Sequence, residues 1–254
     1  MKIAVLFKLV PDLVEELEID ESGTALDTTW LRQIINEPDD HAIEQAILLK
    51  EKMGAHVTVI APEGEATDDV LFTAAAKGAD QLIRLNGDFE EGMTNHALAR
   101  VVTKVIKELQ PDLVFTGVQA HNDLDGSVGP LLAEFLDMPY IGYISGVEVS
   151  GSTALVRKEY PGGLIGEMEV TLPALLGIQS AEQPPRYVAV SKVRQSMKTA
   201  EIEDQDAAEF DSSGAVDVTR MFQPEVGERA TMIDGDEEEV ASRLVEIFKE
   251  IGII

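Results

Sequence analysis

Short apolar runs alternate with amphipathic segments along the first half of the chain. Four runs are almost continuously apolar, as in buried strands, at 2–7, 56–62, 81–85 and 111–117. Between and after them, apolar residues recur at helical spacing, which predicts helices over 36–52, 67–80, 95–109 and 129–137. Strands that alternate with helices in this way indicate an α/β fold with a doubly wound, mainly parallel sheet.

Residues at the predicted helix ends support these boundaries. Pro38 suits the first turn of a helix, and Asp39 suits the positive end of the helix dipole. Thr67 is the expected N-cap of the second helix. Gly54 and Gly78 stand where the first two helices should end, because glycine readily adopts the left-handed conformation of a C-terminal cap.

Two other segments lack the alternation of strand and helix. Residues 10–27 are rich in acids and contain Gly and Pro, so we expect a long loop or hairpin there. Residues 140–179 hold alternating apolar and polar positions interrupted by glycines, which predicts an antiparallel extension made of hairpins.

The last part of the chain differs again. Residues 191–236 are polar and acidic without a sustained period, so we expect an extended arm. The pattern over 236–254 predicts an amphipathic helix with its apolar face on Val240, Leu244, Ile247 and Phe248. We therefore expect an α/β domain over 1–190, followed by an arm and C-terminal helix over 191–254.

Composition narrows the possible functions. Of 254 residues, 44% are hydrophobic, which is enough for a sizeable core, and 47 acids against 20 bases give a net charge of −27. That charge argues against nucleic acid or an anionic membrane as partner. It serves solubility or steers the chain toward a basic partner. There is no cysteine and no apolar run of transmembrane or signal-peptide length, so we expect a cytoplasmic protein without disulfides.

Several kinds of catalytic or metal site have no support in the sequence. His41, His56, His96 and His121 lie in separate predicted elements without metal-ligand spacing, so we interpret them as ordinary surface or loop residues and expect no metal site. The GxSxG motif of hydrolases, the P-loop and the GxGxxG fingerprint are all absent.

The segment GVQAHNDLDGSVGP, at 117–130, connects a predicted strand to a predicted helix. Its small residues Gly126, Ser127, Val128 and Gly129 expose backbone N–H groups at the helix start, which is a common anion-binding arrangement. Two acids, Asp123 and Asp125, would repel a phosphate, so we predict that they point outward. With 7–12 and 36–40, which also lie at ends of strands or starts of helices, this loop is expected to enclose a nucleotide.

Six segments, in this order and spacing, resemble the β subunits of electron-transfer flavoproteins, and the resemblance covers nearly the whole chain. They are FKLVPD (7–12), NEPDDHAIEQAILLKE (36–51), KGAD (77–80), GVQAHNDLDGSVGPLLAEFLDMP (117–139), VRKEYPGG with LPALLGIQSAEQPPRY (156–163 and 172–187), and GDEEEVASRLVEIFKE (235–250).

This resemblance implies an adenine-nucleotide-binding, Rossmann-like fold paired with an α subunit that holds most of a redox-active FAD. The β subunit of such proteins buries an AMP without redox role or, in electron-bifurcating members, a second FAD. The resemblance places phosphate contacts at Gly126, Ser127 and Val128. The full set of implied nucleotide contacts is Leu6, Lys8, Asn36, Glu37, Pro38, Asp39, Pro62, Gly117, Gln119, Ala120, Asp123, Asp125, Gly126, Ser127, Val128 and Gly129.

A second implied surface docks flavin dehydrogenases such as acyl-CoA dehydrogenases. It falls in 183–198, on Arg186, Tyr187, Val190 and Lys192, with Val190 where the family usually has leucine. Leu13 replaces an aromatic residue found near the flavin in some members. Gly126 and Ser127 replace the usual Asn-Gln or Ala-Gln of the phosphate loop. Whether the β subunit binds AMP, FAD or neither therefore stays open.

The resemblance implies an electron carrier in which flavin supplies the redox chemistry and no side chain is catalytic. The arm and C-terminal helix would contact the α subunit. Two alternatives stay open: a bifurcating β subunit whose own FAD oxidises NADH, and a nucleotide sensor similar to universal stress proteins that needs no α subunit.

Overall fold

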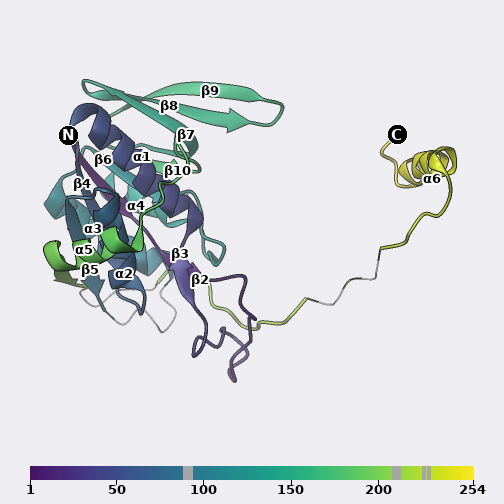
Figure 1. Ribbon diagram of the computed structural model, residues 1–254, viewed down its shortest axis with the longest axis horizontal. Coiled ribbons are helices and arrows are strands. Elements are labelled where there is room, and N and C mark those ends of the chain that lie inside the picture. The colour runs from purple at the N-terminus through teal and green to yellow at the C-terminus, as the bar shows by residue number, and fades with distance from the viewer. Residues whose placement is uncertain (88–93, 208–212, 225–226, 228–229) are drawn as a thin grey trace. The chain divides into compact units, whose positions relative to one another are not determined.

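The structure is a computed structural model that describes residues 1–254 except 88–93, 208–212, 225–226 and 228–229. The chain divides into two compact units, Met1–Thr219 and Arg220–Ile254. The first unit holds the sheet and its covering helices, and the second holds the C-terminal helix (Figure 1).

A nine-stranded sheet within the described residues organises the first unit, with strand order β11-β5-β4-β1-β6-β10-β7-β8-β9. Its parallel core consists of β1 (Lys2–Leu6), β4 (His56–Pro62), β5 (Gln81–Asn86) and β6 (Leu113–Gly117). The chain runs outward from β1 through β4 to β5 and then returns to the other side of β1 as β6. This reversal makes the carboxyl ends of β1 and β6 the switch point where doubly wound sheets bind ligands.

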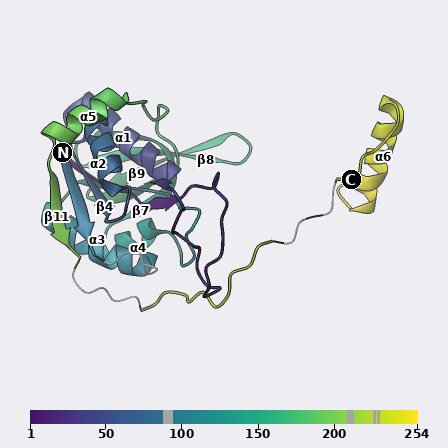
Figure 2. The same cartoon turned by 60° about the horizontal axis from the view of Figure 1, so that its bottom comes forward.

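Helices α1 (Glu37–Met53), α2 (Thr67–Lys77) and α3 (Asn95–Leu109) connect these strands, and α4 (Val128–Leu136) follows β6, as the periodicity predicted. Helices α1 and α2 cover one face of the sheet, and α3 and α4 cover the other (Figure 2). Each face has its own apolar core: Ile43 and Leu71 pack on the first, Val102 and Leu132 on the second. Fully burying such side chains contributes about 1.5–3 kcal/mol each.

The helix ends agree with the sequence at Gly54 and Gly78 but not at Thr67. Gly54 caps α1 in the left-handed conformation, with φ 72°, and Gly78 caps α2. The N-cap of α2 is Ala66 rather than Thr67. Thr67 is instead the first helical residue, and its buried hydroxyl donates a 2.8 Å hydrogen bond to the Pro62 carbonyl, which ties the helix to the end of β4.

Antiparallel hairpins follow α4, as predicted, but they do not account for the whole of 140–179. Strands β7 (Tyr140–Ser150), β8 (Thr153–Tyr160) and β9 (Leu164–Thr171) pair antiparallel and extend the sheet. Strand β10 (Ala174–Ile178) then returns between β6 and β7 and pairs parallel to both. Separately, β2 (Leu9–Pro11) overlaps the start of the loop predicted over 10–27 and pairs antiparallel with β3 (Gln33–Ile35), which lies beyond its end.

The expectation of an irregular arm beginning at residue 191 is wrong for the first part of that segment. Helix α5 (Val190–Thr199) packs on α2, and β11 (Ile202–Asp206) pairs parallel to β5 at the sheet edge. The first unit therefore continues past residue 190 to Thr219.

The second unit contains α6 (Glu237–Glu250), which begins with a capping box between Asp236 and Glu239. No residue of α6 is buried, and its apolar positions Leu244 and Phe248 are 38% and 39% exposed. In the described part of the chain, no helix is long and apolar enough to cross a membrane.

Candidate functional site

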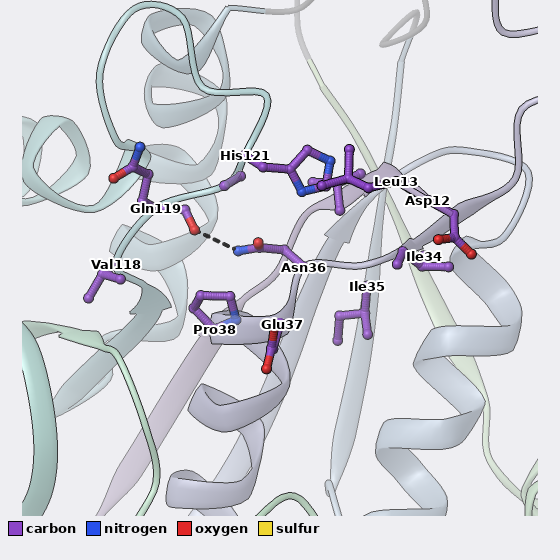
Figure 3. Close-up of a pocket in the computed structure, with 12 residues that line it drawn as sticks. Asp12, Leu13, Ile34, Ile35, Asn36, Glu37, Pro38, Val118, Gln119 and His121 are labelled. Atoms are coloured by element: carbon purple, nitrogen blue, oxygen red, sulfur yellow. Dashed lines mark hydrogen bonds between the residues drawn. The ribbon is translucent and has the colours of Figure 1, made fainter. Parts of the chain in front are cut away.

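A cavity of about 450 Å³ opens where the switch point, the start of α1 and the loop after β6 meet (Figure 3). Its wall combines polar groups of the α1 start and the loop with apolar side chains of β2 and β3. The lining residues are Val10, Asp12, Leu13, Ile34, Ile35, Asn36, Glu37, Pro38, Val118, Gln119, Ala120 and His121. Volume and mixed lining are those of a small-molecule site.

Asp39, in the first turn of α1, joins that helix to both central strands. Its carboxylate accepts hydrogen bonds from the Gly117 amide at 2.6 Å, the Lys8 amide at 2.9 Å and Asn36 Nδ2 at 3.1 Å. The side chain is buried, and burial raises the pKa of Asp39 to about 6 although these hydrogen bonds lower it. Asn36 Nδ2 also donates to the Gln119 carbonyl at 3.1 Å, a bond visible in Figure 3.

Gly117 is required by this close approach. A Cβ at position 117 would lie 2.5 Å from Asp39 Oδ1 and 2.8 Å from the Pro38 side chain. The end of β6 therefore lies directly against the start of α1, and the absence of a side chain at 117 is what permits the Asp39 hydrogen bond.

The start of α4 has the free amides that the sequence predicted. Gly126 has φ 94°, and the N-cap Ser127 makes no side-chain capping bond. Among the described residues, the amides of Ser127, Val128 and Gly129 have no acceptor. Beneath this turn, Thr116 Oγ1 is buried without a hydrogen-bond partner, 2.7 Å from where a Cβ on Gly129 would lie. The helix start thus offers several unused donors to an anion.

The prediction that Asp123 and Asp125 point outward is wrong. The Asp123 side chain is only 4% exposed and accepts hydrogen bonds from Lys8 Nζ at 2.6 Å and the Ala120 amide at 2.8 Å. Asp125 is 6% exposed and accepts from the Asn95 amide at 3.2 Å. Internal donors satisfy both carboxylates, so the acids hold the loop in shape and do not depend on solvent.

Sequence reasoning missed Asn95 and His96, the first two residues of α3. Asn95 is buried, and its Nδ2 donates to Asp123 at 2.7 Å and to the Gly126 carbonyl, while its Oδ1 accepts from Lys8 Nζ at 2.8 Å. His96 Nδ1 lies 3.2 Å from Asp125 Oδ2, so it is not an ordinary surface histidine. Their position in the chain could have indicated them, because the predicted helix over 95–109 follows a strand and so begins at the carboxyl edge of the sheet, as the other site segments do.

The predicted nucleotide contacts fall into separate groups. Five of them line the cavity: Asn36, Glu37, Pro38, Gln119 and Ala120. Lys8 and the acids of the loop belong to the hydrogen-bonded network, and the last residues of the loop form the start of α4. Leu6 is buried in the core beneath α3 and α4, and Pro62 ends β4. Neither of these last two lines the cavity.

The predicted docking residues also separate. Tyr187 and Val190 are 88% and 61% exposed, and Lys192 is exposed. Arg186 instead turns back onto α1, where its guanidinium binds Glu44 and Glu51.

Comparison with known proteins agrees with this architecture. Residues 25–210 match the electron transfer flavoprotein domain. The chain is 34% identical to the electron transfer flavoprotein subunit beta of Methylophilus methylotrophus and to that of Clostridium acetobutylicum, in each case over 98% of both chains. The chain belongs to the electron transfer flavoprotein β subunit family. The chain is also 28% identical, over 100% of both chains, to the acryloyl-CoA reductase electron transfer subunit gamma of Anaerotignum propionicum. Family membership supports a role in electron transfer.

Proposed function

We propose that this family member is the β subunit of a heterodimeric electron transfer flavoprotein. It pairs with an α subunit that holds most of an FAD, and it carries electrons between flavin dehydrogenases of the acyl-CoA type and a downstream acceptor. We further propose that the β subunit itself holds an AMP. The observation that carries the nucleotide proposal is the set of unused amides at Ser127, Val128 and Gly129.

The residues at the start of α4 fit a phosphate. Small residues leave the backbone accessible, and the helix dipole adds partial positive charge at the same point. The nearby acids are compensated, because Asp123 is paired with Lys8 and Asp125 accepts an α3 amide. Orphaned Thr116 Oγ1 adds a buried polar group under the same turn.

The cavity fits the rest of a nucleoside. Asn36 and Pro38 at the start of α1 and Gln119 in the loop supply the polar wall, and the β2–β3 pair supplies the apolar one. FAD, when bound, supplies all of the redox chemistry. This chain's residues bind, orient and shield the nucleotide, and no side chain is assigned a role as acid, base or nucleophile.

A second FAD in place of AMP is the alternative. Val10, Leu13 and Ile34 line the cavity, and this apolar wall suits a flavin ring as well as an adenine. In that case, the β subunit would take electrons from NADH. Leu13 is 59% exposed at this wall and would contact a ring without aromatic stacking.

Cofactor counting on the purified heterodimer tests the proposal. One FAD and one AMP released per heterodimer supports it, whereas two FAD and no AMP supports the bifurcating alternative. Release of no nucleotide beyond one FAD would contradict both.

A proline substitution tests the contact atoms. Val128 is the first residue of α4, a position that tolerates proline, and Ser127 before it has φ −74° and ψ 142°, which suits a residue preceding proline. Val128→Pro removes one amide donor, so nucleotide affinity should fall about tenfold or more. Val128→Ala keeps the amide and is the matched control. Equal affinity in the two variants would show that the Val128 amide does not hold the phosphate.

A further inference from the structure

Residues 180–189, which lead from β10 into α5, have no helix or strand, yet side chains of α1 hold their backbone. Three backbone amides donate to three α1 residues that share one face of the helix. The bonds are Ala181 N–H to His41 Nδ1 at 3.2 Å, Glu182 N–H to Gln45 Oε1 at 3.0 Å and Arg186 N–H to Glu44 Oε2 at 2.9 Å. The path of this segment is thus set by side-chain contacts and not by a strand ladder.

The Arg186 side chain strengthens the same attachment. Its Nε and Nη2 bind the Glu44 carboxylate at 2.8–3.0 Å, and its Nη1 binds Glu51 at 2.6 Å. The Glu44 side chain is 2% exposed, so its charge needs a partner. The planar guanidinium can satisfy both carboxylates at once, which a lysine ammonium cannot do with the same geometry.

Helix α5 depends on attachments at its two ends. No α5 residue is buried, so packing on α2 alone fixes it weakly. After it, β11 pairs with β5, and before it comes the Arg186 attachment. Between these points the chain presents Tyr187 and Val190, which are exposed and lie at the start of α5.

We propose that Arg186 is a positioning residue, which holds residues 180–189 on α1 so that Tyr187 and Val190 present a defined surface to the partner dehydrogenase. This inference rests on the proposed docking function. It changes the role of Arg186 from a residue that contacts the partner to one that fixes the residues that do.

Amide hydrogen exchange on the intact heterodimer tests the attachment. In Arg186→Lys, exchange over 180–199 should be about tenfold faster, because a bidentate charged contact is lost, while β1 and β6 stay unchanged. Arg84→Lys is the matched control. Arg84 also binds two carboxylates, Asp68 and Asp204, but at β11, so its loss should affect 202–206 and not 181–186. Unchanged exchange over 180–199 in Arg186→Lys would overturn the proposal.

Kinetics separate this proposal from the docking function. With a purified acyl-CoA dehydrogenase as electron donor, Arg186→Lys should raise KM for the heterodimer several-fold and leave kcat unchanged, because the flavin is not touched. Tyr187→Ala should do the same. If Tyr187→Ala raises KM and Arg186→Lys does not, the positioning role is wrong and docking stands. If neither variant changes KM, the docking function is wrong, and the positioning role is overturned with it.

Discussion

Ionisation of the buried Asp39 carboxyl should lower the free energy of unfolding. The perturbation that tests this is a change of pH. The carboxylate is buried and has a pKa of about 6, against an ordinary value of 3.8. A folded-state pKa that is raised above the unfolded one means that the folded state binds the proton more tightly. The stability contribution is therefore complete below pH 3.8 and is lost as pH rises through 6.

The size of the effect follows from the difference in pKa. Two pKa units correspond to about 3 kcal/mol over the whole titration. Roughly half of this, about 1.4 kcal/mol, should be lost between pH 5 and pH 7.5, a range that stays above the acidic isoelectric point. Three donated hydrogen bonds oppose the effect of burial, and the prediction is that burial dominates.

Urea unfolding of the purified chain at several pH values, compared with Asp39→Asn, measures this contribution. The asparagine places an amide NH₂ against donors and so lowers stability at every pH, but it cannot titrate. The informative quantity is therefore the change with pH of the difference between the two proteins. Asp137→Asn, at an exposed C-cap, is the control. A pH-independent difference, or a wild type that gains stability relative to the variant as pH rises, would refute the reasoning.

Other substitutions test the packing and the hydrogen bonds around the site. Gly117→Ala should lower the free energy of unfolding by about 2 kcal/mol or more, because its Cβ would overlap Asp39 Oδ1; urea denaturation checks this, and an unchanged midpoint would contradict the close approach. Lys8→Met should lower it by about 3–5 kcal/mol, because it leaves the buried Asp123 charge without its partner; thermal unfolding measures the loss, and Lys8→Arg is the conservative control. Asp236→Ala should weaken the first turn of α6 by about 1 kcal/mol, visible as faster amide exchange over 237–240, and equal exchange rates would show that the capping box is not formed in solution.

Local patterns predicted the elements of the fold better than their pairing. Helix α3 and strand β4 have the predicted bounds because buried faces impose a clear period on the sequence. Strand β11 escaped prediction because its sequence, IEDQD, is polar and pairs at the sheet edge, where only Ile202 packs against the core. The insertion of β10 between β6 and β7 could not be predicted, because strand order depends on contacts distant in sequence.

In the site too, features set by nearby residues could be predicted from the sequence, and contacts between distant residues could not. Small residues between a strand and a helix predicted the free amides at the start of α4. The orientation of Asp123 was mispredicted because its partners, Lys8 and Asn95, lie 115 and 28 residues away and come from other elements. Arg186 was likewise assigned to the partner surface because Glu44, on α1, is 142 residues away.

The inward orientation of Asp123 and Asp125 determines which donors are left to hold the proposed nucleotide. Lys8 is already within 2.6 Å of Asp123, so its charge is matched inside the protein and is not free for a phosphate. Among the described residues, the amides of Ser127, Val128 and Gly129 at the start of α4 have no acceptor, and the helix fixes their direction. In the proposed function, these backbone amides hold the phosphate without a dedicated cation, while the carboxylates of Asp123 and Asp125 fix the backbone of the loop.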